Sequence, residues 1–222
     1  NEVARLCELL GADVHHVAKG MGLDGRIGPK FLHPGPGYGG SCFPKDTKAV
    51  TDIARQAGCP FEIVETVVKV NDDIKLRMVE KIRQACGGSV KGLTLGVLGL
   101  AFKPETDDMR EAPAIPILEA LAGEAGAIRA YDPAAMANAR EVLPSSIQYC
   151  EDAYDAATGA DCLVIMTEWN QFRSLDIDRL KGLLRQLRVV DLRNVYEPER
   201  MREEGFEYVG VGRATGGAQR LV

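Results

Sequence analysis

One cysteine stands inside a glycine-rich stretch of the chain, where its thiol could act as a nucleophile. The sequence GPGYGGSCFPKD occupies positions 35–46 and places Cys42 shortly after two adjacent glycines. Glycines carry no side chain, so they let a ligand approach the backbone and the thiol. Pro44 is typical of the first turn of a helix, and a helix N-terminus favours the thiolate form of a nearby cysteine. The pattern therefore predicts covalent catalysis by Cys42.

Two charged residues follow Cys42 in the first turn of this predicted helix. Lys45 adds positive charge near the thiol, and Asp46 is suited to hold a water molecule or to accept a proton. The structural alternative is a buried cysteine beside a capping aspartate. For the other cysteines we favour such a structural interpretation, because they fall on helix faces, in strands or at the ends of these elements: Cys7, Cys59, Cys86, Cys150 and Cys162.

The Cys42 stretch lies in a long loop between predicted helices. The opening residues keep helical spacing from the first position, which suggests that this helix begins upstream and that the chain is a fragment. Loops of about twenty residues are usually functional or disordered in a compact domain. The predicted helices span residues 1–10, ended by Gly11, 13–22, capped by Asp13, 44–57 and about 60–85.

The apolar pattern changes after residue 88. Short apolar runs alternate with a helical pattern, which is typical of a parallel sheet with crossover helices. Strands are predicted at 94–100, 127–133, 160–169 and 187–195, with a helix at 114–126. The predicted fold class is therefore α/β, with a helical central part (1–87) followed by a Rossmann-like α/β sandwich (88–222).

The sheet lacks the dinucleotide fingerprint. The junction after its first strand reads GVLGLAFKPETDDMRE, in which Gly96 and Gly99 have the wrong spacing for G-x-G-x-x-G. The G-x-G of Gly210 and Gly212 precedes no helix and is predicted to be part of a tail. We therefore expect no dinucleotide in the crevice of this sheet.

The loop after the first predicted strand carries two cations that could face phosphates, Lys103 and Arg110. In the alternative interpretation they are solvated cations that pair with neighbouring carboxylates, and the residues alone do not decide between the two.

Composition excludes several classes of partner. The 222 residues carry a net charge of −5, which offers no basic stripe for nucleic acid. No apolar run approaches the ~18 residues of a membrane span. The six cysteines form no CxxC pair, which favours reduced thiols and a cytoplasmic location. The three histidines, His15, His16 and His33, do not form a metal site by their spacing.

Three motifs together resemble the UDP-glucose branch of the UDP-glucose/GDP-mannose dehydrogenase family. They are GYGGSCFPKD, the loop AFKPETDDMRE, and TEW followed by Phe172, and the resemblance covers nearly the whole chain. Members of that family have an N-terminal NAD-binding domain, a central helix that forms a dimer and a C-terminal UDP-binding domain. The resemblance implies that this chain holds the second and third parts, forms a homodimer, and that the NAD domain would precede residue 1.

The resemblance also implies a reaction. UDP-glucose would be oxidised twice at C6 by two NAD, giving UDP-glucuronate through an aldehyde and a cysteine thioester. Cys42 matches the nucleophile of the family, and Asp46 matches the aspartate that works with the hydrolytic water. The remaining catalytic groups of the family would precede residue 1, so the chain alone is expected to be inactive.

Further residues are assigned by the same resemblance. Phe31, Tyr38 and Gly39 resemble the segment that wraps the UDP-sugar, and Arg26 resembles an arginine that reaches the sugar bound by the partner subunit. Contacts with UDP are implied for Phe102, Lys103 and Arg193, and contacts on the NAD side for Arg110 and Lys45. The sequence departs from the family pattern at His33, Pro34 and Pro36, where contacts with the sugar are least defined.

Three alternatives stay open. The first is a dehydrogenase for GDP-mannose or for a UDP-N-acetylamino sugar, which shares a similar Cys-x-x-Lys-Asp arrangement. The second is a non-catalytic module that binds nucleotide sugars. The third, a cysteine hydrolase, is weaker, because the sequence places no histidine with an orienting partner beside Cys42.

Overall fold

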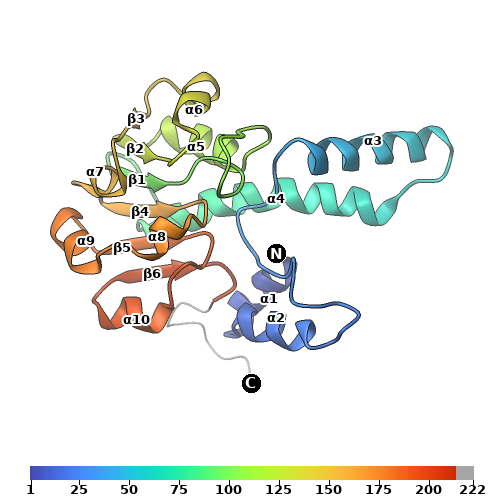
Figure 1. Cartoon of the computed structure of the whole chain (residues 1–222), viewed down its shortest axis with the longest axis horizontal. Helices are drawn as coiled ribbons and strands as arrows, with labels where there is room; N and C mark the ends of the chain where they lie inside the picture. The colour runs from blue at the N-terminus through green and yellow to red at the C-terminus, as the bar shows by residue number, and fades with distance from the viewer. Residues whose placement is uncertain (214–222) are drawn as a thin grey trace.

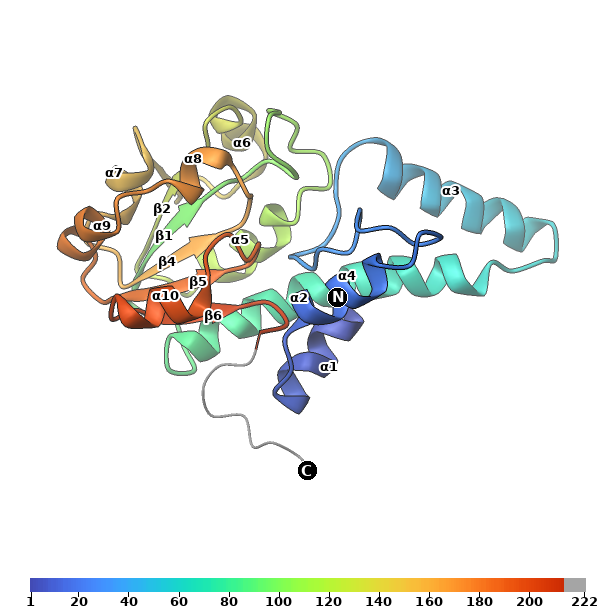
Figure 2. The same cartoon turned by 60° about the horizontal axis from the view of Figure 1, so that its bottom comes forward.

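The computed structural model describes residues 1–213 and shows a parallel sheet at one end with a helical arm projecting from it (Figure 1). Four helices make up the amino-terminal part: α1 (Glu2–Leu10), α2 (Val14–Gly22), α3 (Cys42–Gln56) and α4 (Glu62–Ala85). The arm consists of α3 and the first half of α4, which lie side by side in both views (Figures 1 and 2).

The predicted end of α1 at Gly11 and the predicted cap of α2 by Asp13 are both confirmed. Gly11 ends α1 in the left-handed conformation, with a φ of 70°. The Asp13 carboxylate accepts a hydrogen bond of 2.7 Å from the backbone N–H of His15 and so caps α2. Helix α3 begins at Cys42, two residues before the predicted start at Pro44, so the thiol belongs to the first helical residue.

A six-stranded parallel sheet follows, in the order β3-β2-β1-β4-β5-β6. The α/β fold class is thereby confirmed. The strands are β1 (Thr94–Leu98), β2 (Ala127–Tyr131), β3 (Gln148–Tyr149), β4 (Cys162–Ile165), β5 (Arg188–Asp191) and β6 (Glu207–Gly210). The helices between them are α5 (Ala114–Ala122), α6 (Met136–Val142), α7 (Ala153–Ala157), α8 (Asn170–Arg173), α9 (Ile177–Leu183) and α10 (Pro198–Glu203).

Two strands, β3 and β6, were not predicted, and the assignment of Gly210 and Gly212 to a tail is wrong. Gly210 ends the edge strand β6. Gly212 packs against α1, because a Cβ at this position would lie 2.6 Å from the Cβ of Ala4. The short sequence EYVG gives little strand signal by itself, and the contacts that hold it come from distant parts of the chain.

Neighbouring residues of the central strands face opposite sides of the sheet. Val97 and Val164 belong to a buried cluster shared with α4 and α5, while Leu98 and Ile165 belong to a second cluster shared with α7 to α10. The second half of α4 contributes Ile74, Met78 and Ile82 to the first cluster. The core therefore continues across residue 88, and the division there into two domains stays a prediction.

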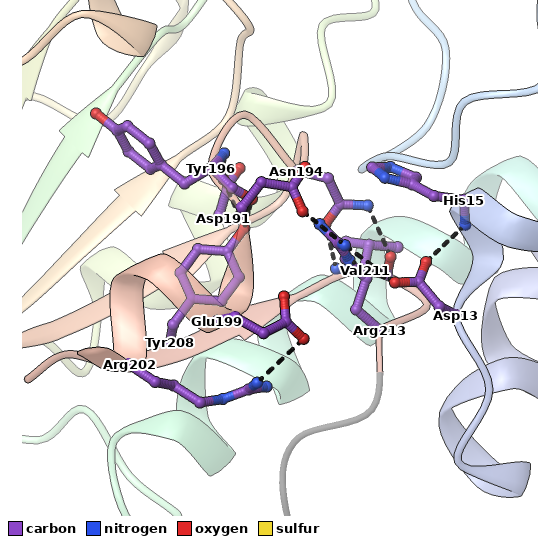
Figure 3. A network of polar contacts seen from close by, with 11 residues as sticks. Asp13, His15, Asp191, Asn194, Tyr196, Glu199, Arg202, Tyr208, Val211 and Arg213 are labelled. Atoms are coloured by element: carbon purple, nitrogen blue, oxygen red, sulfur yellow. Dashed lines mark hydrogen bonds and ion pairs between the residues drawn. The ribbon is translucent and has the colours of Figure 1, made fainter. Parts of the chain in front are cut away.

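A polar network ties the edge of the sheet to α2 (Figure 3). Arg213, just past β6, forms ion pairs of 3.0 Å with Asp13 and with Glu197. The Asn194 side-chain amide donates a hydrogen bond of 2.8 Å to the Val211 carbonyl oxygen and accepts one of 2.9 Å from the Val211 N–H. The end of the described chain is thus fixed against the amino-terminal helices.

Candidate functional site

A cavity of about 980 Å³ opens where the amino-terminal loop meets the sheet. Its walls come from the loop around residues 30–43, from α4, and from the loops that follow β1 and β5. Open α/β sheets bind ligands at the carboxyl ends of their strands, and this cavity lies at that edge. The structure brings together there six residues that the sequence singled out: Phe31, Tyr38, Gly39, Phe102, Lys103 and Arg193.

The glycines before Cys42 have a packing role. A Cβ on Gly39 would come within 3.0 Å of the carbonyl oxygen of Glu111, and one on Gly40 would meet the Phe102 ring at 2.8 Å. The backbone N–H of Gly40 also donates a hydrogen bond of 2.8 Å to the carbonyl oxygen of Arg110. The glycines therefore let this loop lie directly on the loop after β1, in addition to the open backbone that the sequence suggested.

Asn71 of α4 fixes the same loop one residue before Gly39, a role that the sequence did not reveal. Its side-chain oxygen accepts a hydrogen bond of 2.8 Å from the N–H of Tyr38, and its side-chain nitrogen donates one of 3.2 Å to the Tyr38 carbonyl. Asn71 is buried. A buried amide in a helix is a signal for such a contact, because it requires partners, but the sequence does not show which segment supplies them.

Cys42 lies exposed at the N-terminus of α3. Next to it, the Lys45 ammonium pairs with the Asp46 carboxylate at 3.0 Å, and both side chains are largely exposed. The hydrogen bond to Asp46 and the charge of its carboxylate raise the pKa of Lys45. None of these three residues lines the cavity, although Phe43, next to Cys42, does.

Arg193 is built into the wall of the cavity. Its guanidinium donates hydrogen bonds to the carbonyl oxygens of Met166 (2.9 Å) and Phe102 (3.1 Å) and lies 3.1 Å from the Glu168 carboxylate. Burial lowers the pKa of Arg193, and the negative charges of Glu168 and Asp191 oppose this effect. The arginine thus connects the loop after β5 to the loops after β1 and β4.

Asp191, at the end of β5, holds the turn that presents Arg193. Its carboxylate accepts hydrogen bonds from the backbone N–H groups of Arg193 and Tyr196, both at 3.0 Å, and from the Tyr208 hydroxyl at 2.8 Å. Figure 3 shows Asp191 between the two tyrosines. Burial raises the pKa of Asp191 despite these hydrogen bonds, which favour its charged form.

Asp132, directly after β2, holds the loop after β1, and the sequence did not reveal this role either. Its two oxygens accept four hydrogen bonds of 2.7–3.1 Å from the N–H groups of Leu100, Ala101, Ala134 and Ala135. In dinucleotide-binding sheets an acidic residue instead binds a ribose hydroxyl. Because the Asp132 oxygens are occupied and the glycine fingerprint is missing, the described residues do not fit NAD in this crevice.

The aromatic and basic side chains at the cavity differ in how firmly they are held. Lys103 is exposed, with its Nζ 5.3 Å from the centre of the Phe102 ring. Tyr38 contacts Phe43 edge to face, with 4.6 Å between ring centres. The Phe31 side chain is fully exposed, and its φ of 62° lies in the left-handed region. The cavity therefore combines Arg193, which is held in the wall by hydrogen bonds, with the exposed side chains of Lys103 and Phe31.

Arg26 and Arg110 do not line the cavity. Arg26 is exposed and pairs with Asp24 at 2.6 Å. Arg110 pairs with Asp108 at 2.8 Å, and its guanidinium lowers the pKa of that carboxyl. For Arg110 this is the pairing that the alternative interpretation of the loop anticipated.

Residues 1–213 contain neither a cluster of metal ligands nor a membrane-spanning helix. In this range no three side chains of the His, Cys, Asp or Glu type are grouped so that they could hold a metal ion. None of the helices in the range combines the length and apolar character needed to cross a bilayer.

Comparison with known proteins identifies the family. Residues 1–73 match the model for the central domain of the UDP-glucose/GDP-mannose dehydrogenase family, and residues 96–198 match the model for its UDP-binding domain. A UDP-glucose 6-dehydrogenase of Rhizobium meliloti (strain 1021) is 51% identical over 96% of this chain and 48% of that protein. One of Bacillus subtilis (strain 168) is 44% identical, over 96% of this chain and 46% of that protein.

Solved structures agree with this result. The structure of a UDP-glucose dehydrogenase from Pyrobaculum islandicum superposes with a TM-score of 0.84 at 37% identity, covering 96% of this chain and 47% of that one. A UDP-D-ManNAc dehydrogenase from Pyrococcus horikoshii gives a TM-score of 0.79 at 25% identity, with the same coverage. The chain spans about half the length of the relatives it matches. With both of its parts matched by models of one family, the chain belongs to the UDP-glucose/GDP-mannose dehydrogenase family.

Proposed function

We propose that this chain is the substrate-binding and thiol-bearing part of an NAD-dependent UDP-glucose 6-dehydrogenase. The observation that carries the proposal is the cavity of about 980 Å³, in which the glycine-rich loop leading to Cys42 meets the two loops of the UDP-binding domain. The relatives that bear this name share 44–51% of their residues with the chain over the matched length.

In this proposal the cavity holds the UDP-sugar. Phe102 packs against the nucleotide, while Lys103 supplies positive charge for the diphosphate. Arg193 completes the wall and keeps the Phe102 loop in place through the hydrogen bond to its carbonyl. Phe31, Tyr38 and Gly39 line the cavity from the loop that leads to Cys42, and we propose that they contact the sugar. Arg26, which is outside the cavity, is proposed to serve the site of a partner subunit.

The chemistry of the chain's own residues starts at the Cys42 thiolate. It attacks the C6 aldehyde of the partly oxidised sugar and forms a thiohemiacetal, whose alkoxide can release hydride and leave a thioester. Asp46 then positions the water that hydrolyses the thioester and accepts its proton. NAD supplies the hydride acceptor when bound, and because the described residues do not fit it, we assign its site to a part of the protein outside this chain. Lys45 and Arg110 are proposed to face that part.

The assembly and location follow from the same proposal. Apolar side chains on the arm are exposed, among them Ile53 (65%), Phe61 (47%) and Ile63 (82%). Burial of these side chains against a second copy of the chain would complete the arm, so we propose a homodimer. The exposed free thiol of Cys42 favours a reducing compartment, the cytoplasm.

A related substrate is the second candidate. The similarity to a UDP-D-ManNAc dehydrogenase, at a TM-score of 0.79, favours a UDP-N-acetylamino sugar as the alternative to UDP-glucose. The higher identity, 51%, to a protein named UDP-glucose 6-dehydrogenase favours glucose.

Calorimetric titration of the chain tests the proposal. UDP and UDP-glucose should bind weakly, UDP-N-acetylmannosamine and GDP-mannose more weakly still, and NAD should give no heat of binding. Lys103→Ala should weaken the binding of UDP by about tenfold, as expected for one charged hydrogen bond. Lys91→Ala is the matched control, since Lys91 is also exposed but precedes β1, at the other end of that strand.

Tighter binding of NAD than of UDP would contradict the assignment of the cavity. Equal binding of UDP by the Lys103→Ala and Lys91→Ala variants, both weaker than the unchanged chain, would contradict the place given to the diphosphate. A loss of catalysis on its own does not bear on either outcome, because the chain without its nicotinamide-binding part is expected to be inactive.

A further inference from the structure

Thr167 begins the motif TEW, two residues after the end of the central strand β4. Trp169 of this motif and the following Phe172 lie in the buried cluster shared with α7 to α10, so they anchor the segment to the core. Thr167 is also buried, and it does not line the cavity. A buried hydroxyl requires a hydrogen-bonding partner, and the partner of Thr167 lies in the loop after β1.

The Thr167 hydroxyl donates a hydrogen bond of 2.7 Å to the carbonyl oxygen of Ala101. Ala101 is buried and directly precedes Phe102 and Lys103, the two residues of this loop that line the cavity. The Ala101 carbonyl belongs to the peptide unit that joins Ala101 to Phe102. The hydroxyl therefore fixes the backbone at the point where it enters the cavity wall.

Gly99 brings the loop after β1 close enough for this contact. Its φ is 89°, and a Cβ at this position would lie 2.5 Å from the Thr167 Cβ and 2.7 Å from the Thr167 Oγ1. The backbone N–H of Gly99 also donates a hydrogen bond of 2.8 Å to the carbonyl oxygen of Tyr131. Because residue 99 has no side chain, the loop lies directly on Thr167.

Other side chains hold the backbone on either side of this hydrogen bond. The Asp132 carboxylate accepts hydrogen bonds of 2.7 and 3.1 Å from the N–H groups of the two residues before Phe102. Arg193 donates one of 3.1 Å to the Phe102 carbonyl. The Ala101 carbonyl lies between these contacts and is held by Thr167. Without the hydroxyl, this buried carbonyl would lose that donor and would have to turn towards another, which would move Phe102 and the residue after it.

We propose that Thr167 is a positioning residue for the nucleoside diphosphate of the substrate. Its hydroxyl fixes the Ala101 carbonyl and thereby holds the Phe102 ring and the Lys103 ammonium where they meet the nucleotide. The inference rests on the proposed function, because that function places UDP against these two side chains. Thr167 itself lies outside the cavity wall, so it acts only through the loop after β1.

Calorimetric titration of the complete chain with UDP tests this role with a pair of substitutions. Thr167→Val keeps the shape of the side chain and removes the hydroxyl, so the Kd for UDP should rise about tenfold. Thr167→Ser keeps the hydroxyl and should bind UDP nearly as tightly as the unchanged chain. Thr51→Val is the matched control, because Thr51 is also buried and its hydroxyl donates a hydrogen bond of the same length, 2.7 Å, to the Lys48 carbonyl in α3. This control should leave the Kd unchanged.

A double-mutant cycle with Lys103→Ala separates positioning from a general loss of stability. Lys103→Ala is expected to weaken UDP binding about tenfold in the otherwise unchanged chain. In the Thr167→Val background the same change should weaken it less than about threefold, because the ammonium is already displaced from the diphosphate. Thermal unfolding without ligand verifies that each variant is folded at the temperature of the titration. If valine impairs folding, Thr167→Ala also removes the hydroxyl, and the same results are expected.

Three results in a chain that binds UDP would overturn the role of Thr167 and leave the proposed function intact. The first is an unchanged Kd in Thr167→Val. The second is full additivity of Thr167→Val and Lys103→Ala, which would show that the hydroxyl does not act through Lys103. The third is an equal loss of affinity in Thr51→Val, which would make the effect a general one of buried hydroxyls. If the unchanged chain gives no heat of binding with UDP, the proposed function and this inference both fail.

Discussion

The thiol of Cys42 and the carboxylate of Asp46 lie on the same exposed turn of α3, but they are proposed to act in different steps. In a longer protein that carries this chain and a nicotinamide-binding domain, Cys42→Ser replaces a good nucleophile and leaving group by a poor one, so turnover should stop after partial reaction. Asp46→Asn should slow the hydrolytic step by about 100-fold or more and leave substrate binding unchanged. Rapid-quench analysis of the enzyme-bound ester separates the two steps.

Cys59→Ser is the control for this experiment, since Cys59 is also an exposed free thiol, at the far end of the arm beyond α3. It should keep full activity. Full activity of Cys42→Ser, or loss of UDP-glucose binding in Asp46→Asn, would remove these residues from the catalytic roles proposed for them.

The close packing around Gly39 leaves no room for a side chain, and the stability of this chain alone can test that role. A Cβ at this position would come within 3.0 Å of the Glu111 carbonyl oxygen, so Gly39→Ala forces the glycine-rich loop away from the loop after β1. We expect the free energy of unfolding to fall by about 1–3 kcal/mol, the usual effect of overpacking. Gly25→Ala is the control, because a Cβ there meets nothing within 4 Å. Urea denaturation of both variants provides the measurement, and equal stabilities would contradict the packing role.

At the scale of elements, the contact between α2 and the end of β6 depends on the ion pair of Asp13 with Arg213. Burial acts to raise the pKa of Asp13, but the hydrogen bonds from the His15 N–H and from Arg213 outweigh it, so the pKa is lowered from 3.8. A depressed carboxyl pKa contributes stability above the unfolded-state value, and this contribution is lost as the pH falls through the folded-state value. The contact should therefore weaken below about pH 4.

Thermal unfolding between pH 3 and pH 7 measures this effect. Arg213→Gln should destabilise the chain at pH 7 and should show a smaller further loss on acidification than the unchanged chain, since its Asp13 no longer has the charged partner. Arg185→Gln, which breaks the pair with Asp161 just before the central strand β4, should leave the contribution of Asp13 in place. An acid profile that is the same in the Arg213→Gln variant and in the unchanged chain would exclude Asp13 as its source.

The elements that the sequence predicted are those whose signals are local. The left-handed glycine at residue 11 and the side-chain cap of Asp13 act within a few residues. Strands β1 and β4 are mainly apolar, and β2 and β5 combine apolar residues with an arginine. In contrast, β6 is held by contacts with residues far away in the sequence, such as that between Tyr208 and Asp191. Pattern and propensity within the four residues of β6 carry no information about such partners.

The same distinction applies to the candidate site. Cys42 and the glycines were recognised from their spacing and from the family resemblance. Asn71 and Asp132 were not, because their partners are backbone groups of Tyr38, 33 residues away, and of Leu100, 32 residues away. Side chains that fix a loop by binding its backbone leave no mark in the sequence of that loop, so their role becomes visible only in the folded chain.

At the scale of the whole molecule, the arm exposes apolar surface that a single copy of the chain does not cover. Ile63 is 82% exposed on the first half of α4, and Ile53 is 65% exposed on α3. If this surface forms the proposed homodimer, an aspartate placed there must be desolvated on association, at a cost that outweighs the burial of one apolar side chain. Ile63→Asp should therefore weaken the dimer strongly while leaving the fold intact, because the side chain contributes nothing to the core of the single chain.

Sedimentation equilibrium at micromolar concentration distinguishes the outcomes. The unchanged chain should sediment as a dimer, and Ile63→Asp should shift the mass towards the monomer by raising the dissociation constant at least about 100-fold, the equivalent of about 2.7 kcal/mol. Val142→Asp is the matched control, since Val142 is 44% exposed on α6, in the sheet-bearing part of the molecule and away from the arm. A monomeric mass for the unchanged chain, or equal dissociation in the two variants, would show that the exposed face of the arm is not the dimer interface and that another partner must cover it.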